Sequence, residues 1–424
     1  MANTYLTRTP SSAGNRKIFT FSAWVKRCNQ SGANVIFQQA SDSANRFSLN
    51  FQNEYLRWRG VTGGSNAAYL QTNRAFRDPS AWYHIVARFD STNATAGDRM
   101  RLYVNGVEET SFSTDINPSL NYESLVNTTN PIDIGRDNAG NSSFFDGSMS
   151  HIHFIDGTAY DATEFGETDA TTGEWKIKTD VSVTYGTNGF FILKDNASPT
   201  DQSGNGNNFS GGGAIRDCED NPSNVFCTYN PLIPSDLDYA NGNTDVQQTT
   251  NTDWEATKGT LGFTEGKYYW EVKISSNSGD PWDQFHGIAG ENAITSGATY
   301  DATPSVIFAA GGTIDVDGTI TQSGLGQSSD GDIIGIAVDA DNSNIDFYRN
   351  GTQVGTTQAL SSNSGFWLPF SGFAGNRTAQ ANFGNGHFGT TVVSSAGTNA
   401  SGNGIFEYDV PTGYTALSTK GLNL

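Results

Sequence analysis

The sequence predicts an all-β protein made of two tandem antiparallel β-sandwiches. Three observations support this fold class. Asn105-Gly106 and Asn350-Gly351 mark two hairpins with the same local pattern, one in each half of the chain. Glycine (48 residues), phenylalanine (26) and tyrosine (16) are abundant, which is typical of strands and turns. No long stretch has apolar residues at the three-and-four spacing of a helix, so helices should be few and short.

The hairpin in the second half is the clearest element of the sequence. Ile334, Ile336 and Val338 alternate with smaller or polar residues, as in a strand with one buried face. After a polar turn, a second strand enters Asn350-Gly351, a pair that accepts the positive φ angles of a type I′ turn. The matching pattern around Asn105-Gly106 therefore predicts a related sandwich in the first half.

The first half contains strand candidates about ten residues apart, separated by turn signals. In the stretch IFTFSAWVK, Phe19, Phe21 and their alternates form one face, and Trp24 lies on the opposite face. This spacing is typical of a sandwich. The strands are expected at 18–26, 35–39, 46–51, 55–59, 82–90, 101–104, 131–135 and 144–156.

These strands also carry a family resemblance. The ordered phrases FTFSAWVKR, WYHIVARFD, RLYVNGVEE and FFDGSMSHIHFIDGTAYDATEF, within residues 4–165, resemble the laminin G-like branch of the concanavalin A-like lectins and glucanases. The resemblance implies a two-sheet antiparallel jelly roll. It does not imply one function, because that family includes glycan binders, calcium-dependent binders and structural modules.

The second half resembles another family. In GKYYWEVKI, Tyr268, Trp270, Val272 and Ile274 share one face of a predicted strand. This phrase, followed by HGIAG, GDIIGIAVD, IDFYRNG and LPFSGF, resembles the SPRY family over residues 251–388. The resemblance implies a second concanavalin A-like sandwich whose loops contact a protein or peptide. Its further strands are expected at 285–290, 305–310, 345–349, 366–373 and 379–383.

An ordered connector rich in proline, glycine and asparagine is expected between the sandwiches. Strands are predicted at 175–185 and 189–194, and Pro222, Pro231 and Pro234 stiffen the remainder. The phrases DQSGNGNN and DNPSNVFCTYNPL resemble a connector between lectin-like modules in virion proteins of tailed bacteriophages. The predicted domains are 1–165, 166–235 (the connector) and 236–424 with a C-terminal extension.

Charge and cysteine content narrow the partners and the place of synthesis. With 24 basic and 44 acidic residues the net charge is −20, which disfavours nucleic acid as a partner. Cys28, Cys218 and Cys227 are expected as thiols. The sequence has no secretory signal core and no run of 18 apolar residues, so we expect cytoplasmic synthesis without membrane insertion.

Motifs for catalysis are missing, so we expect a protein that is not an enzyme. A glycanase of this fold would need closely spaced acids on a strand, and no such run occurs. His151 and His153 are the closest histidine pair, and no third metal ligand accompanies them. Neither a Gly-x-Ser-x-Gly elbow nor a phosphate-binding Gly-Lys-Ser/Thr loop is present.

Ligand binding would need an exposed aromatic ring beside polar groups. Two sequence clusters meet this description, and one loop residue is a further candidate. Hard oxygen donors at one turn would suit calcium as a cofactor. The ligand-binding candidates are Trp282, Asp283, Gln284 and His286, then Arg57, Trp58 and Arg59, and Asn342. The calcium candidates are Asp339, Asp341 and Asn344, for which turn formation is the alternative explanation.

Together these features predict a non-catalytic structural protein of a tailed bacteriophage virion. We expect a tail fibre, appendage or capsid fibre that adheres to a host-surface glycan or protein, reaching the virion after synthesis in the host cytoplasm. Other virion proteins and further copies of the chain are the expected partners. The loops around Trp282 and Asn342 would face the host. One alternative is an architectural capsid decoration or tail joint without a ligand, and another is a polysaccharide-degrading enzyme.

Overall fold

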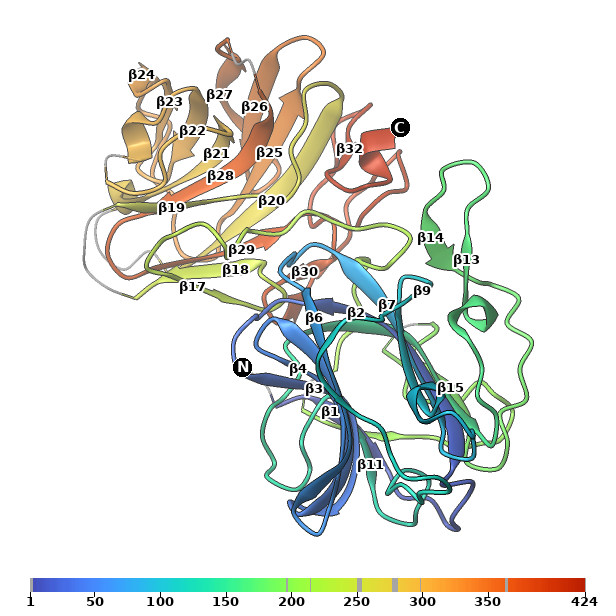
Figure 1. The fold of residues 1–424 in the computed structure, drawn as a ribbon. Helices are drawn as coiled ribbons and strands as arrows, with labels where there is room; N and C mark the ends of the chain where they lie inside the picture. Colours follow the sequence, from blue (N-terminus) through green and yellow to red (C-terminus); the bar gives the residue numbers. More distant parts are fainter. Residues whose placement is uncertain are drawn as a thin grey trace. The chain divides into compact units, whose positions relative to one another are not determined.

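The chain divides into two compact β-rich units. The computed structural model describes residues 3–195, 197–213, 215–249, 254–276, 281–297, 299–362 and 365–423. The units are Met1–Asp217 and Cys218–Leu424. Within the described residues the regular elements are strands and five 3-10 turns, with no α-helix (Figure 1). None of these turns is long and apolar enough to cross a membrane.

The first unit contains two large antiparallel sheets, of eight and six strands. In spatial order the eight-stranded sheet consists of β10 (Phe112–Ile116), β6 (Ser65–Ala75), β5 (Tyr55–Thr62), β4 (Asn45–Gln52), β3 (Ala33–Asp42), β11 (Ile132–Ile134), β1 (Tyr5–Arg8) and β16 (Ser210–Gly212). The six-stranded sheet consists of β15 (Phe190–Ile192), β12 (Gly147–Asp156), β2 (Ile18–Arg27), β7 (Trp82–Asp90), β8 (Met100–Val104) and β9 (Val107–Glu108).

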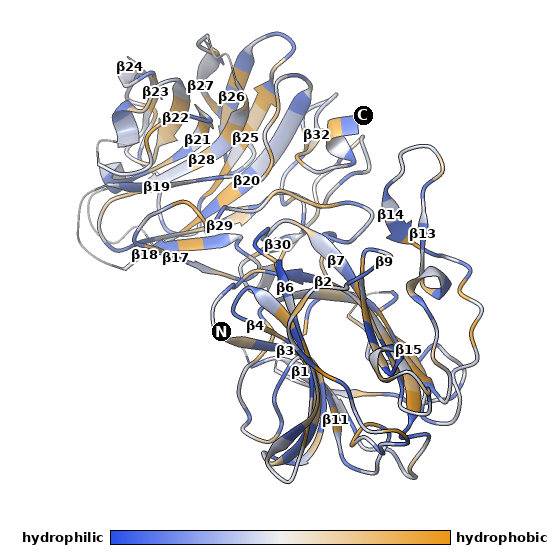
Figure 2. Ribbon diagram, viewed as in Figure 1, coloured by the Kyte–Doolittle hydropathy of each residue, from blue (hydrophilic) through white to orange (hydrophobic). Residues whose placement is uncertain are grey.

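Aromatic residues from the inner faces of both sheets form the core of the first unit. Phe19 stacks on Phe89 at 4.8 Å, and both rings meet Phe47 and Trp58 edge to face. Such edge contacts suit the ring quadrupoles and add to the burial of apolar area. The strands that line this interior carry orange, hydrophobic segments in Figure 2.

The other face of the six-stranded sheet is covered as well. The chain after β12 crosses this face through η2 (Ala162–Glu164) and the small hairpin of β13 (Gly166–Thr168) and β14 (Trp175–Ile177). Trp175, Val181 and Val183 there pack with residues on the outer side of β7 and β8. Both faces of β2 are therefore buried, although its polar alternates suggested only one buried face.

The second unit repeats the two-sheet plan. One sheet has the order β17 (Leu237–Ala240), β18 (Asp245–Gln248), β29 (Arg377–Asn382), β20 (Lys267–Ser276), β25 (Ile333–Asp339), β26 (Asn344–Arg349) and β27 (Thr352–Ala359), with β32 (Thr415–Ala416) parallel to β20. The other has the order β19 (Glu255–Lys258), β28 (Trp367–Phe373), β21 (Gln284–Gly290), β22 (Ser305–Ala309), β23 (Thr313–Val316) and β24 (Thr319–Gln322).

Six short elements complete the described structure. The remaining strands β30 (His387–Phe388) and β31 (Thr391–Val392) pair with each other. The remaining 3-10 turns are η1 (Ala96–Asp98) in the first unit and η3 (Pro281–Asp283), η4 (Thr299–Asp301) and η5 (Gly421–Asn423) in the second.

A C-terminal segment covers part of the outer face of the β20 sheet. Phe406, Val410 and Ala416 pack with Tyr269 and Ala337. Glu271, on β20 and fully buried, accepts hydrogen bonds of 2.9 Å from the backbone N–H groups of residues 407 and 408. This segment, part of the predicted C-terminal extension, thus forms a second layer on the sheet.

The predicted fold class is confirmed, and the structure refines its boundaries. Both Asn-Gly pairs form hairpins with positive φ angles, 48° and 79° at Asn105 and Gly106. Residues of the expected connector, 166–235, take part in both units: β15 and β16 join the first unit's sheets, and Tyr229 bridges to Gly259 in the second. The unit boundary accordingly falls at 217/218.

Candidate functional site

An exposed tryptophan lies at one end of the second sandwich. The 3-10 turn η3 precedes β21 and carries Trp282, whose side chain remains 44% exposed. The indole lies against Gly311, where any Cβ would overlap the ring. Because glycine leaves the backbone open there, a flat aromatic surface is held in place while part of it still faces solvent. Trp282 therefore meets the requirement for an aromatic platform.

The neighbouring acid, Asp283, holds this end together. Its carboxylate accepts a 2.7 Å hydrogen bond from Nη2 of Arg377, whose side chain is 4% exposed. Its carbonyl accepts another from the N–H of Ala374 at 2.7 Å. Asp283 thus ties η3 to the start of β29. Its negative charge is balanced by a buried guanidinium, which favours a supporting role beside Trp282.

Gln284 and His286 are buried, so they do not form an exposed polar surface beside Trp282. They are 0% and 1% exposed on β21. His286 Nδ1 lies 2.9 Å from Ser371 Oγ, which also contacts the hydroxyl of Tyr229 at 2.8 Å. Burial lowers the pKa of His286 to about 3, so the ring is neutral. These residues form a polar patch inside the sandwich.

Asn342 is exposed, but it lies at the other end of β20 from Trp282. The register pairs Lys267, the first residue of β20, with Asp339 beside the Asn342 turn. Trp282 follows the last residue of β20. Ten strand residues at about 3.3 Å each separate the two ends by roughly 30 Å. The structure does not bring the two predicted loops into one surface.

The calcium candidates are engaged with hydrogen-bond donors. Asp339 forms a 2.7 Å ion pair with the ammonium of Lys267 and accepts two hydrogen bonds from Asn342. Although burial opposes it, these contacts lower the pKa of Asp339. Asp341 accepts from the N–H of Gly266 at 2.7 Å. An ammonium and N–H donors are the opposite of the oxygen shell that calcium needs.

Metal binding finds no further support in the part of the chain that the structure describes. Asn344 opens β26 opposite Asp339 and is half-buried. No group of three or more histidine, cysteine or acidic side chains among the described residues could hold a metal ion. The observed contacts at the Asn342 turn are those of turn-forming residues.

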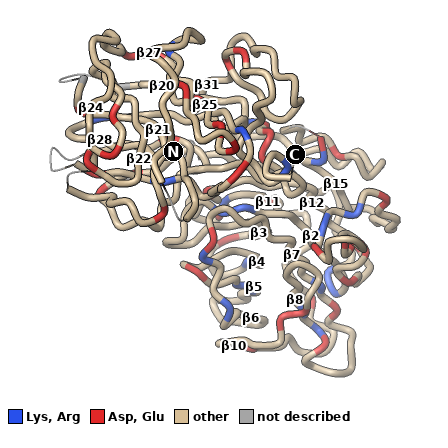
Figure 3. Tube along the Cα trace, turned by 90° about the horizontal axis from the view of Figure 1, so that it is seen from above, with Lys and Arg blue, Asp and Glu red and all other residues tan. Residues whose placement is uncertain are grey.

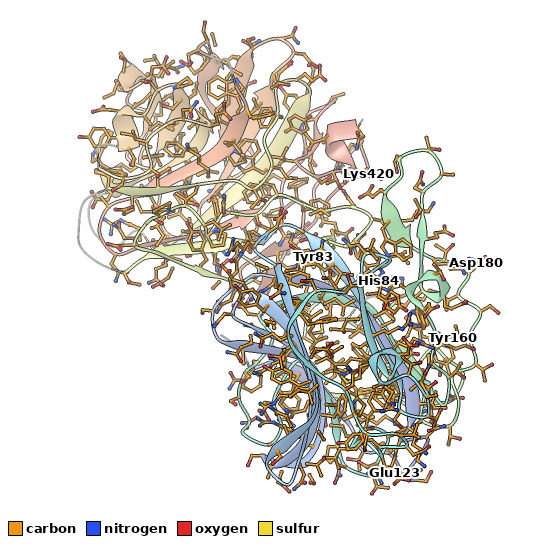
Figure 4. All side chains as sticks on the ribbon, viewed as in Figure 1. Tyr83, His84, Glu123, Tyr160, Asp180 and Lys420 are labelled. Carbon is orange, nitrogen blue, oxygen red and sulfur yellow. The ribbon has the colours of Figure 1, made fainter. Side chains whose placement is uncertain are left out.

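The first unit contains a buried Ser–His pair whose hydrogen bond runs in the direction opposite to the one that nucleophilic catalysis requires. His84, labelled in Figure 4, accepts at Nδ1 from the indole N–H of Trp175 at 3.0 Å. Its proton therefore lies on Nε2, which donates to Ser22 Oγ at 2.9 Å. A general base would have to accept the serine proton at that nitrogen. Burial lowers the pKa of His84 to about 3, so the ring stays neutral.

Trp58 is a core residue, and the prediction that it forms an exposed platform is wrong. It is 1% exposed and packs between the sheets. Because side chains alternate along β5, the flanking Arg57 and Arg59 point to the outer face of the eight-stranded sheet. There they lie beside polar side chains of β4 and β6. We call Ser48, Asn50, Arg57, Arg59, Tyr69 and Gln71 the sheet-face array.

The three cysteines have the predicted thiol form. Cys28 and Cys227 are buried and Cys218 is exposed, all as thiols. Cys218 Sγ donates to the carbonyl of Asp220 at 3.4 Å, and Cys227 Sγ to that of Thr228 at 3.6 Å.

Comparisons with known proteins agree with the two folds. Residues 2–164 match the family model of the concanavalin A-like lectin/glucanases superfamily, and residues 267–386 match that of the SPRY domain. No curated protein sequence matches the chain.

Solved structures similar to part of the chain include three SPRY domains. The SPRY domain of human HERC1 is 18% identical, with 36% of this chain and 96% of that chain covered and a TM-score of 0.32. The TRIM65 PSpry domain is 14% identical, with 37% and 91% covered and a TM-score of 0.30. Another human SPRY domain is 18% identical, with 35% and 94% covered and a TM-score of 0.28.

Proposed function

We propose that this protein is a non-catalytic adhesive component of a tailed bacteriophage particle, displayed as a tail fibre, appendage or capsid fibre. Two folds typical of binding modules and the connector phrases between them support the proposal. The observation that carries the adhesive role is Trp282, a partly exposed indole fixed over Gly311. Its partner would be a glycan or protein of the host surface, since both offer surfaces that stack on aromatic rings.

A non-catalytic role is supported by the groups that could otherwise act in acid–base chemistry. Burial raises the pKa of Glu271 to about 7, a value suited to a general acid, but the C-terminal segment covers its carboxylate. His84 donates to Ser22 and has no solvent access. Both side chains thus stabilise the fold.

Assembly on the particle is part of the same proposal. The protein would be made in the host cytoplasm, join other virion proteins as a homo-oligomer, and meet the host surface after lysis. The net charge of −20 favours solubility during this passage. An architectural decoration or tail joint would share these properties but would not need an exposed aromatic platform.

Adsorption to host cells tests the adhesive role. The Trp282→Ala variant should bind with about tenfold lower affinity, because the stacking surface is removed while the Asp283–Arg377 ion pair remains. Phe366→Ala is the matched control, since Phe366 is 52% exposed but precedes β28 at the opposite end of the sandwich.

Two outcomes would separate the candidate functions. Equal adsorption of the wild type and Trp282→Ala would remove the adhesive role of this platform. Images of labelled particles that place the protein at a buried joint, together with no adsorption, would favour the architectural function.

A further inference from the structure

The outer face of the long sheet in the first unit carries positive charge on a strongly acidic chain. Acidic residues outnumber basic ones by 44 to 24, yet Arg46, Arg57 and Arg59 lie close together on β4 and β5. Blue segments mark the basic residues of these strands in Figure 3. Partial burial lowers the pKa of Arg59, and the positive charges of the neighbouring Arg57 and Arg46 lower it further. An anion bound here would relieve this mutual repulsion.

The sheet-face array is an ordered grid, because three central strands pair in register. One row contains Ser48, Arg59 and Tyr69, and the next contains Asn50, Arg57 and Gln71. Neighbouring strands lie about 4.8 Å apart, and alternate residues about 6.7 Å apart along a strand. The grid is therefore an area about 10 Å wide, in register between two irregularities of the β5–β6 pairing.

Both guanidinium groups are held through Nε, with their outer nitrogens available. Arg57 Nε donates to Asn50 Oδ1 at 3.3 Å, and Arg59 Nε donates to Asn66 Oδ1 at 2.6 Å. No described side chain forms an ion pair with either arginine or accepts from its Nη atoms. Arg46, in contrast, pairs with Asp137 at 3.7 Å. The two Nη pairs form oriented forks of the kind that bind carboxylates bidentately.

The remaining members of the array suit a sugar. The guanidinium of Arg59 lies 5.5 Å from the centre of the Tyr69 ring, and the Tyr69 hydroxyl donates to Gln71 at 2.8 Å. An aromatic ring, the amide of Gln71 and a phenol hydroxyl can meet both the apolar face and the hydroxyl groups of a saccharide. The buried amide of Asn50 instead orients Arg57. A peptide strand cannot add here, because β4, β5 and β6 are paired on both sides.

We propose that the sheet-face array binds a carboxylate-bearing polysaccharide, with Arg57 and Arg59 each gripping a carboxylate of a uronic acid residue. This site lies in the first unit and does not depend on the role proposed for Trp282. It would let the chain recognise acidic surface polymers despite its own negative charge.

Calorimetric titration of the full chain with oligogalacturonate, and with neutral dextran as the second ligand, tests the proposal. We expect binding of the uronate alone, weakened by added salt. Arg57→Gln with Arg59→Gln should weaken it at least about tenfold. Arg57→Lys with Arg59→Lys, which keeps the charge but removes the forks, should also weaken it.

The controls separate this site from general charge effects and from the second unit. Arg74→Gln with Arg77→Gln removes the same charge from arginines already paired with Glu109 and Glu54 and should bind like the wild type. Trp282→Ala should also bind like the wild type, whatever its effect on adsorption. Circular dichroism confirms that each variant is folded.

Four results would overturn the proposal. These are no uronate binding by the wild type, unchanged binding by the Gln variant, unchanged binding by the Lys variant, and equal or tighter arginine-dependent binding of polyglutamate or dextran sulfate. The last result would assign the array to an acidic peptide or a sulfated polymer.

Discussion

At the scale of single residues, a few buried polar groups fix how covering segments lie on the sheets. Glu271 is the clearest example, because its carboxylate accepts from two backbone N–H groups of the C-terminal segment at 2.9 Å and from the amide of Asn382 at 3.3 Å. Charge-assisted hydrogen bonds of this kind are stronger than neutral ones. The C-terminal segment is therefore held by polar contacts as well as by the packing of Phe406.

Replacing Glu271 with glutamine should loosen this segment. The amide cannot accept all of these hydrogen bonds, and its NH₂ group would face donors, so we expect a loss of about 3 kcal/mol of the second unit's free energy of unfolding. Hydrogen exchange at residues 405–410 should accelerate. Glu265→Gln, at an exposed position, is the control. Unchanged exchange in Glu271→Gln would mean that apolar packing alone holds the segment.

At the scale of elements, the sequence predicted strands well where the two-residue period coincided with turn signals. Trp82–Asp90 has the predicted bounds, and Ile85 and Phe89 point into the core. β6, an eleven-residue strand, was missed because SNAAYLQTNRA contains few β-branched or aromatic residues. In contrast, 178–185 was predicted as a strand. In this segment Val181 and Val183 pack on the six-stranded sheet. A two-residue period shows only that one face is buried, and it does not show that the segment pairs with a neighbouring strand.

The Asn350-Gly351 hairpin offers a test of the local rules. Gly351 has a φ of 76°, and a Cβ there would approach the ring of Tyr408 to 2.6 Å. Gly351→Ala should therefore lower the free energy of unfolding of the second unit by about 1–3 kcal/mol in urea titrations. Gly242→Ala, also at positive φ (77°) but with open space around it, separates backbone strain from the ring contact. Equal losses in both variants would exclude a contribution from Tyr408.

The candidate sites also show what a sequence pattern leaves open: alternation predicts that neighbouring residues lie on opposite faces, and it does not predict which face is buried. Alternation explains why Arg57 and Arg59 face outward once Trp58 faces the core. The sequence alone could not decide which face the tryptophan takes, since either side of a sandwich strand can be covered. Gln284 and His286 were assigned to a surface for the same reason, and both lie inside the sandwich.

At the scale of the whole molecule, the two units use one architecture but bury different titratable groups. Each unit has two sheets, and a segment from outside the two-sheet core covers an outer face. The first unit buries His84 and His153, and the second buries His286 together with Glu271. Since histidine and glutamate respond to burial with opposite shifts of pKa, the units should differ in their response to acid.

Acidification should destabilise the first unit more than the second. Burial lowers the pKa of His84 to about 3 and that of His153 well below 6.5, so the unfolded state binds more protons below pH 6.5 and stability is lost as pH falls. His286 acts likewise in the second unit. There, however, burial raises the pKa of Glu271 to about 7, which adds stability as pH falls from 7 towards 4.5.

Hydrogen exchange measured between pH 7 and pH 4.5, corrected for intrinsic rates, resolves the two units in one sample. Each histidine contributes a slope of up to about 1.4 kcal/mol per pH unit, so the first unit should open first. Glu271→Gln should remove the opposing contribution and make the second unit more acid-sensitive relative to its own value at pH 7. If both units lost protection in parallel in the wild type and in this variant, the buried histidines and Glu271 would not govern the acid response.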